Sequence, residues 1–246
     1  MSEKQSITRT SEFLRGAKDT IPLMVGAAPF GTIFGAVAIG AALTPAAVMG
    51  FSLIVFAGSA QFIAAKLFAD GLSVGLIILT TFIVNLRHAL YSASLGPYMK
   101  DLSQKWMLPL AFWLTDETYA VVINNYPQDL PYKRWYHLGS AIAMYSNWQI
   151  WTLIGVVAGT QLEGIADLGL EFALVVTFIG IVVPMLISRP MVLTAIVAGI
   201  VSIIARDIPN NGGLMVAALA GIITGIIAES VLPTPKATVI ALEDEI

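Results

Sequence analysis

The sequence has no cysteine and very little charge. Among its 246 residues, 13 are lysine or arginine and 16 are aspartate or glutamate, so charged residues make up 12%. A soluble globular domain carries roughly twice that share, about 25%. The absence of cysteine excludes a disulfide framework, a thiolate metal site and a cysteine nucleophile. A soluble enzyme is therefore not expected.

The sequence also lacks the patterns of several large functional classes. Its net charge of -3 and pI near 5.3 leave no basic surface that could neutralise nucleic-acid phosphates. It contains no phosphate-binding loop, no zinc-protease motif and no nucleophile elbow. The two histidines, His88 and His137, are not at metal-ligand spacing. We expect no cofactor, no bound metal, no nucleic-acid partner and no enzymatic activity.

Long apolar runs are what the sequence has in abundance. Hydrophobic residues make up 57% of the chain, and the mean hydropathy is +0.81. A helix needs about 20 apolar residues to cross a bilayer, and no strand-like alternation is visible. The chain is thus expected to be an all-α polytopic membrane protein with about seven or eight transmembrane helices, of which the seventh is short enough to be a half-span or re-entrant. The expected spans are 21–41, 45–68, 72–96, 106–124, 137–159, 169–187, 190–205 and 212–230.

The polar ends of the chain complete the expected organisation. Residues 1–20 are a polar N-terminal tail, residues 21–230 a single transmembrane domain, and residues 231–246 an acidic C-terminal tail. With eight alternating spans, the positive-inside rule places both termini in the cytoplasm. The richer side receives Lys4, Arg9, Arg15, Lys18, Lys66, Lys133, Arg134, Arg189 and Lys236, and the other side receives Lys100, Lys105 and Arg206.

Glycine and proline interrupt two of the spans. The first span contains Gly26, Pro29, Phe30 and Gly31, where a missing backbone donor and flexible neighbours favour a broken helix. Broken helices bind small charged substrates in many transporters, so we expect these residues to contact substrate. The alternative is a packing kink that allows close helix approach. A second candidate break lies at 180–184.

Five amide or hydroxyl side chains lie inside otherwise apolar spans. They are Ser59 and Gln61 in the second span, Asn85 in the third, and Asn147 and Gln149 in the fifth. Such groups either bond neighbouring helices or line a polar cavity, and we assign them to substrate binding. The segment around Gln61 is loosely similar to the one around Gln149, which is consistent with an internal repeat.

Ionisable residues inside the membrane concentrate in the third and fourth spans. Arg87 and Asp116 lie equally far from the middle of the connection between these spans, so an antiparallel pair of helices would bring them to one depth. We predict an Arg87–Asp116 ion pair. Glu117 points about 100° away from Asp116 on a helix. Glu117 or His88 is the expected proton carrier, and Tyr119 belongs to the same gating group. The alternative is that the pair only fixes helix register.

Several segments together resemble the AzlC/YgaZ family of branched-chain amino acid exporters. The similar segments are Gly26–Gly35 (GAAPFGTIFG), Phe56–Phe62 (FAGSAQF), Asn85–Tyr91 (NLRHALY), Thr115–Ala120 (TDETYA), Ser146–Ile150 (SNWQI) and Glu171–Ala173 (EFA). The resemblance covers about residues 20 to 230. It implies the large subunit of a two-component bacterial inner-membrane exporter of valine, leucine, isoleucine and similar amino acids, with a small AzlD/YgaH-type membrane partner.

The expected function is secondary transport of neutral amino acids out of the cell, driven by proton entry. The substrate would be a small-molecule amino acid, and the surroundings would be the lipid bilayer. A passive channel and a non-transporting subunit of a membrane complex are the alternatives. An intramembrane enzyme is disfavoured because no nucleophile and base occur at productive spacing.

Overall fold

The computed structural model describes residues 7–128, 131–161, 186–208 and 212–232, together with residues 179 and 183. Every regular element in these ranges is an α-helix, which confirms the all-α expectation for this part of the chain. The chain divides into two compact units, Met1–Leu174 and Val175–Ile246, which are described separately. By length and composition, Arg9–Gly40 and Val74–Met99 are apolar enough to cross a membrane. Most of the expected sixth span, 169–187, and most of the expected acidic tail, 231–246, lie outside the described residues.

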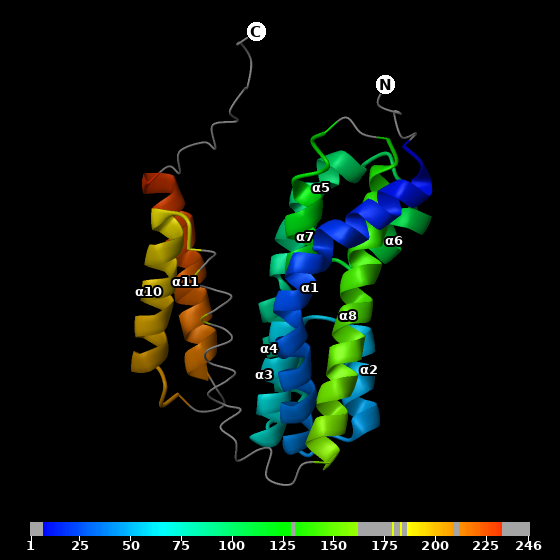
Figure 1. Cartoon of the computed structure of the whole chain (residues 1–246). Helices are drawn as coiled ribbons and strands as arrows, with labels where there is room; N and C mark the ends of the chain where they lie inside the picture. The colour runs from blue at the N-terminus through cyan, green and yellow to red at the C-terminus, as the bar shows by residue number, and fades with distance from the viewer. Residues whose placement is uncertain are drawn as a thin grey trace. The chain divides into compact units, whose positions relative to one another are not determined.

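The first unit is built on two long helices, α1 (Arg9–Gly40) and α8 (Lys133–Gln161), which run side by side (Figure 1). A methyl group added to Gly16 would overlap the carbonyl of Tyr136, and one added to Gly35 would overlap the carbonyl of Thr152. Early residues of α1 thus meet early residues of α8, and late residues meet late ones. The two helices are parallel and pack almost backbone to backbone.

α1 is continuous, so the helix break predicted at Pro29 is wrong. The helix passes through both Pro22 and Pro29, although each proline removes one backbone donor. Close packing against α8 holds the helix together there: Gly31 lies against Trp151. Residues 9–20, expected as part of a polar tail, form the first turns of α1 and also pack on α8.

The second expected span, 45–68, is not one helix but two half-helices. They are α2 (Pro45–Val55) and α3 (Gly58–Ala69), separated by a left-handed residue, Phe56, with φ 42°. Phe34 of α1 contacts Phe51 of α2 and Phe62 of α3, with ring centroids 6.4 and 5.6 Å apart. Those two rings would be about 16 Å apart along a straight helix. The chain therefore reverses, and α2 and α3 form a hairpin.

The third expected span is present as two nearly continuous helices. α4 (Val74–Asn85) passes into α5 (Arg87–Met99) through Leu86, which keeps right-handed helical angles. Together the two helices are about 39 Å long at 1.5 Å per residue. This length is enough to connect the two ends of the unit.

The fourth expected span, 106–124, is a second hairpin of half-helices. α6 (Gln104–Phe112) and α7 (Asp116–Ile123) are separated by three residues, the last of which, Thr115, caps α7 through its side chain. Trp106 packs edge-on against Trp135, with centroids 4.9 Å apart, and the Tyr126 hydroxyl is 3.1 Å from His137 Nδ1. The start of α6 and the loop after α7 therefore both lie beside the start of α8. A single straight helix over 106–124 is excluded.

Taken together, the first five expected spans are three long helical segments and two hairpins. We call the end of this unit where α1 begins the near end, and the end where α1 stops the far end. The α2–α3 hairpin enters from the far end, and the α6–α7 hairpin enters from the near end (Figure 1). Each hairpin follows a long segment, α1 or α4–α5, and these two segments run in opposite directions. The order therefore has the form of an inverted repeat, although the similar segments around Gln61 and Gln149 do not correspond within it.

With two hairpins in place of two spans, the basic residues are distributed more unequally between the two ends of the unit than eight alternating spans would predict. Among the described residues of this unit, one lysine, Lys66, lies toward the far end, and it pairs with Asp70 at 3.3 Å. Arg87 lies between the two ends. The basic side chains at the near end are Arg9, Arg15, Lys18, Lys100, Lys105, Lys133 and Arg134.

The second unit contains a pair of packed helices, α10 (Arg189–Ile204) and α11 (Gly212–Val231). A methyl group on Gly221 would lie 3.3 Å from Ala198 Cβ, and one on Gly225 would lie 3.2 Å from the Thr194 hydroxyl. Small residues thus allow close contact here as well. The seventh expected span, 190–205, corresponds to the continuous helix α10. The candidate break at 180–184 falls on residues of which only 183 is described.

Candidate functional site

The two hairpins meet at the middle of α8. We call residues 56–57 the α2–α3 elbow and residues 113–115 the α6–α7 elbow. Phe56 lies edge-on against Tyr145 with ring centroids 4.8 Å apart, and Trp113 lies on the same tyrosine at 5.9 Å. Tyr145 therefore bridges two chain reversals that enter the unit from opposite ends.

At the α6–α7 elbow, the predicted ion pair between Arg87 and Asp116 is confirmed. Arg87 Nη1 is 2.8 Å from Asp116 Oδ2, and the Tyr91 hydroxyl donates a 2.5 Å hydrogen bond to Asp116 Oδ1. One part of the prediction was wrong, because Arg87 and Asp116 do not lie on two antiparallel helices. α6 runs antiparallel to α5 from the near end to the elbow, and α7 then runs back parallel to α5. Asp116 is deep in the unit because it begins α7 at the elbow.

Aromatic and polar side chains surround this pair. Tyr91 and Tyr119 stack with centroids 4.5 Å apart, and the Tyr119 hydroxyl is hydrogen-bonded to Ser94 at 2.9 Å. His88 Nδ1 lies 3.1 Å from the carbonyl oxygen of Asn85. Arg87 Nε and Asn85 Oδ1 are buried without a hydrogen-bond partner in the described part of the chain. Polar groups beside the elbow thus remain unpaired within the described part of the chain.

Glu117 stands next to this pair with no salt bridge to any described residue. Its helix, α7, is capped by Thr115, whose hydroxyl accepts from the Thr118 backbone N–H at 3.4 Å. Acidic residues in a first helical turn are favoured by the positive end of the helix dipole. The first turn of α7 thus places the Glu117 carboxylate at the positive end of the helix dipole, next to Asp116 in the chain.

One turn after the α2–α3 elbow, α3 contains a buried side-chain amide that no described residue pairs with. Gln61 has no exposed surface, and among the described residues neither its amide nitrogen nor its amide oxygen is hydrogen-bonded. The Ser59 hydroxyl is likewise buried and has no partner in the part of the chain that the structure describes. Buried polar atoms in native proteins are nearly always paired with protein, water or a ligand.

The two amides of α8 differ in their surroundings. Asn147 donates to the carbonyl of Met24 at 3.1 Å and accepts from Trp151 Nε1 at 3.1 Å, so it joins α1 to α8. Gln149 donates to the carbonyl of Ser52 at 3.1 Å, but its amide oxygen is buried and unpaired among the described residues. Gln149 keeps an acceptor available near the α2–α3 elbow, whereas Asn147 does not.

The structure does not bring all the predicted residues together. Gly26 and Pro29 lie on an exposed face of α1, and a methyl group on Gly26 would contact nothing within 4 Å. Phe30 is half-buried, and Gly31 packs against α8. Of these four residues, Gly31 lies in the contact between α1 and α8, whereas Gly26 and Pro29 face outward.

Four residues at the elbows were missed as site residues. Tyr91 carries the clearest signal, since it lies one helical turn after Arg87. The aromatic residues Phe56, Trp113 and Tyr145 are recognised only once the chain reversals are known, because each packs across an elbow.

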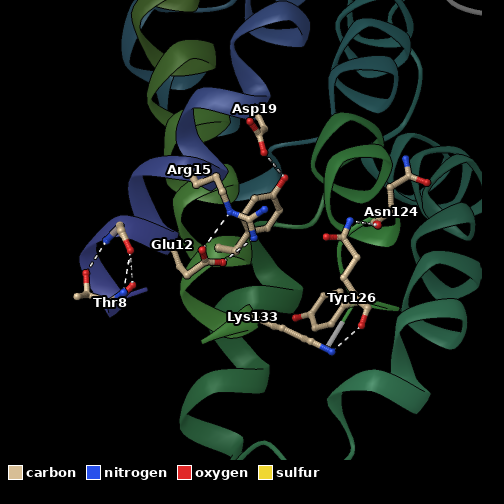
Figure 2. A network of polar contacts seen from close by, with 10 residues as sticks. Thr8, Glu12, Arg15, Asp19, Asn124, Tyr126 and Lys133 are labelled. Carbon is tan, nitrogen blue, oxygen red and sulfur yellow. Dashed lines mark hydrogen bonds and ion pairs between the residues drawn. The ribbon is translucent and has the colours of Figure 1, made fainter. Parts of the chain in front are cut away.

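At the near end, a polar network ties α1 to α8 (Figure 2). Glu12 and Arg15 form an ion pair at 2.6 Å, and the Arg15 guanidinium lies 4.5 Å above the Tyr136 ring. The Tyr136 hydroxyl donates to Asp19 at 2.8 Å. Burial raises the pKa of Tyr136 above its usual value, and the hydrogen bond to Asp19 raises it further. The tyrosine therefore stays a donor throughout the neutral range.

Comparisons with known proteins identify the family of the chain. The AzlC protein family matches residues 22–162, the range from α1 to α8. The Escherichia coli inner membrane protein YgaZ is 30% identical over 88% of this chain and 89% of its own length. The Bacillus subtilis branched-chain amino acid transport protein AzlC is 25% identical over 65% of this chain and 62% of its own. No solved structure matches the chain significantly. The chain belongs to the AzlC family of membrane proteins.

Proposed function

We propose that the protein is a secondary transporter that exports branched-chain and related neutral amino acids across the bacterial inner membrane. Two relatives support this proposal: one is named as a branched-chain amino acid transport protein and one as an inner membrane protein. The observation that carries it is the meeting of two half-helix elbows, from opposite ends of the unit, at Tyr145.

This arrangement suits transport because it exposes backbone dipoles deep inside the protein. Irregular backbone at membrane depth is tolerated where it is buried in protein or lines a cavity. Transporters place substrate at such discontinuous helices near the middle of the bilayer, and a hairpin open to each side allows alternating access. We place the substrate between the elbows, beside Ser59, Gln61 and Gln149.

The α6–α7 elbow is proposed as the coupling and gating element. Arg87 and Asp116 hold α5 against α7, so separating them would open one side of the unit. Glu117 has no salt bridge among the described residues and lies beside this pair, which makes it the proposed proton carrier, with His88 as the second candidate. Proton entry at Glu117 would then alter the charge balance on which the Arg87–Asp116 pair depends.

Two further features belong to the proposal. The near end, with its basic residues, faces the cytoplasm by the positive-inside rule, and so does the N-terminus. A small AzlD/YgaH-type membrane subunit is the proposed partner, following the family resemblance of the sequence.

Transport by the purified protein in liposomes tests this function, with and without the small subunit. We expect uphill movement of valine when a pH gradient is imposed. Glu117→Gln should abolish the response to the gradient. Glu229→Gln, the same change at an exposed position near the end of α11, should leave it intact. Downhill flux alone would identify a channel, and flux only with the small subunit would identify an obligate complex.

A further inference from the structure

We infer that the start of α3 is a carboxylate subsite, which binds the α-carboxylate of a zwitterionic amino acid at the α2–α3 elbow. This inference rests on the proposed transport function and assigns one end of the substrate to one helix terminus. It follows from the buried, unpaired polar groups around Gly58, Ser59 and Gln61.

The first turn of α3 has no side-chain cap, as is also true of α4, α5 and α6. The cap residue is Ala57, which offers no side-chain acceptor, whereas Thr44 caps α2 and Thr115 caps α7. The backbone N–H of Gln61 donates to the Ala57 carbonyl at 2.9 Å, but the backbone N–H groups of the three preceding residues have no acceptor among the described residues. Free N–H groups and the helix dipole make such a terminus an anion-binding position.

An independent observation also indicates a ligand at this terminus. Gln61 is completely buried, and its amide nitrogen and oxygen are both unpaired in the described part of the chain. Helical side chains lean toward the N-terminus of their helix, so the Gln61 amide is directed back to the first turn of α3. It can offer a donor to a carboxylate bound there.

Other unpaired groups surround the same turn. The Trp148 ring lies against Gly58, where an added methyl group would be 2.9 Å from the ring, and its indole N–H is buried without a partner among the described residues. The Ser59 hydroxyl is a further donor that no described residue pairs with. Donors from α3 and α8 thus gather where the helix dipole favours negative charge.

The acceptors on the other side of the elbow suit an ammonium group. α2 ends at the elbow, and the C-terminal end of a helix favours positive charge. The Gln149 amide oxygen is buried and unpaired among the described residues, and Gln149 reaches α2 through the Ser52 carbonyl. Residues 41–65 contain no charged side chain. A ligand with no net charge, whose two charges face opposite helix ends, fits this elbow.

Binding of L-valine and its analogues to the purified full-length protein tests the subsite. Wild type should bind valine at least about tenfold more tightly than valinol, which has a hydroxymethyl group in place of the carboxylate. Gln61→Glu places a negative charge at the subsite and should weaken valine binding at least about tenfold. The same variant should gain preference for 2-methylpropylamine, the analogue without a carboxylate. Gln128→Glu is the matched control at an exposed loop position and should bind valine as wild type does.

The possible outcomes distinguish failure of the carboxylate subsite from failure of the proposed transport function. If wild type bound valine and valinol equally well, or if Gln61→Glu bound valine within about twofold of wild type, the subsite would be wrong and the transport function would stand. If wild type bound no neutral amino acid, both would be overturned. Should Gln61→Glu fail to elute as a folded protein, Ser59→Ala serves instead, with valine binding expected to weaken about three- to tenfold.

Discussion

At the scale of single residues, Asp116 holds two partners at once. Arg87 neutralises its charge at 2.8 Å, and Tyr91 donates to its other oxygen at 2.5 Å. Arg87 is only partly exposed, with 29% of its side-chain surface accessible, so removing its counter-charge leaves a cation that water compensates incompletely. The pair therefore contributes to stability as well as to the proposed gating.

A double-mutant cycle measures this coupling. Asp116→Asn keeps an oxygen for Tyr91 but no charge for Arg87, and should lower the free energy of unfolding by about 1–3 kcal/mol. Arg87→Gln should cost a similar amount, and the double variant should cost clearly less than the sum of the two. Thermal unfolding in detergent gives the values. Strictly additive losses would mean that the two side chains do not stabilise one another.

Tyr136 gives a prediction about pH. Its pKa is raised in the folded protein by burial and by the Asp19 hydrogen bond, so the unfolded chain loses this proton at lower pH than the folded protein does. The stabilisation from Tyr136 is therefore fully present below about pH 10 and is lost as pH rises further. Tyr136→Phe should be less stable by about 0.5–1.5 kcal/mol at neutral pH.

The same comparison at alkaline pH provides the check. The stability difference between wild type and Tyr136→Phe should shrink between about pH 10 and pH 11. In this range the tyrosine ionises in the unfolded chain but not in the folded protein, which stabilises the unfolded state of wild type only. Unfolding midpoints measured across this range decide the matter. A constant or growing difference would contradict a raised pKa.

The charged residues of the candidate site could be predicted from the sequence, but the packing of helices that surrounds them could not. The scarcity of charge made Arg87 and Asp116 conspicuous, and equal spacing from a turn placed them at one depth. Tyr145 could not be recognised in the same way. Its position between Phe56 and Trp113 depends on two chain reversals, and the apolar runs that contain them read as uninterrupted spans.

At the scale of elements, the packing of α1 on α8 depends on glycines that face the other helix. Gly35 and Gly155 approach the backbone of the opposite helix so closely that no Cβ atom fits. Gly26 lies on the same helix as Gly35 but faces away, with nothing near it. The same residue type thus has opposite roles within one helix, which the sequence alone did not distinguish.

Two alanine substitutions should separate these roles. Gly35→Ala should destabilise the protein by about 2 kcal/mol or more, because the added methyl group must push the backbones of α1 and α8 apart. Gly26→Ala should be neutral or stabilising by up to about 1 kcal/mol, because alanine favours the helix more than glycine does. Thermal unfolding of the two variants tests the contrast, which equal effects would refute.

The elements that the sequence predicted well were those with a simple hydropathy pattern. The long helices α1, α4–α5 and α8 agree with three expected spans within a few residues, apart from the extra turns at the start of α1. The hairpins were misread because each contains about as many apolar residues as one span. Hydropathy counts apolar residues but does not report the direction in which the chain runs.

At the scale of the whole molecule, the two hairpins are the main departure from eight alternating spans. Each hairpin begins and ends at the same end of the unit, and the two hairpins use opposite ends. Their elbows therefore place irregular backbone in the middle of the unit, although neither hairpin passes from one end to the other. The clustering of basic residues at the near end agrees with this topology. Eight alternating spans would place Lys100 and Lys105 on the side with few basic residues, whereas the hairpins place them at the near end with the other basic residues. Both the proposed substrate site and the proposed coupling site depend on it.

Thiol labelling in intact cells tests this topology most directly, because the natural chain contains no cysteine. Single cysteines at Ala46, Ser73, Ser103 and Gln128 report on the four connections of the hairpins. With the near end in the cytoplasm, a membrane-impermeant reagent should label Ala46→Cys and Ser73→Cys but neither Ser103→Cys nor Gln128→Cys. Eight alternating spans predict labelling of Ala46→Cys and Ser103→Cys only, and that result would contradict the account.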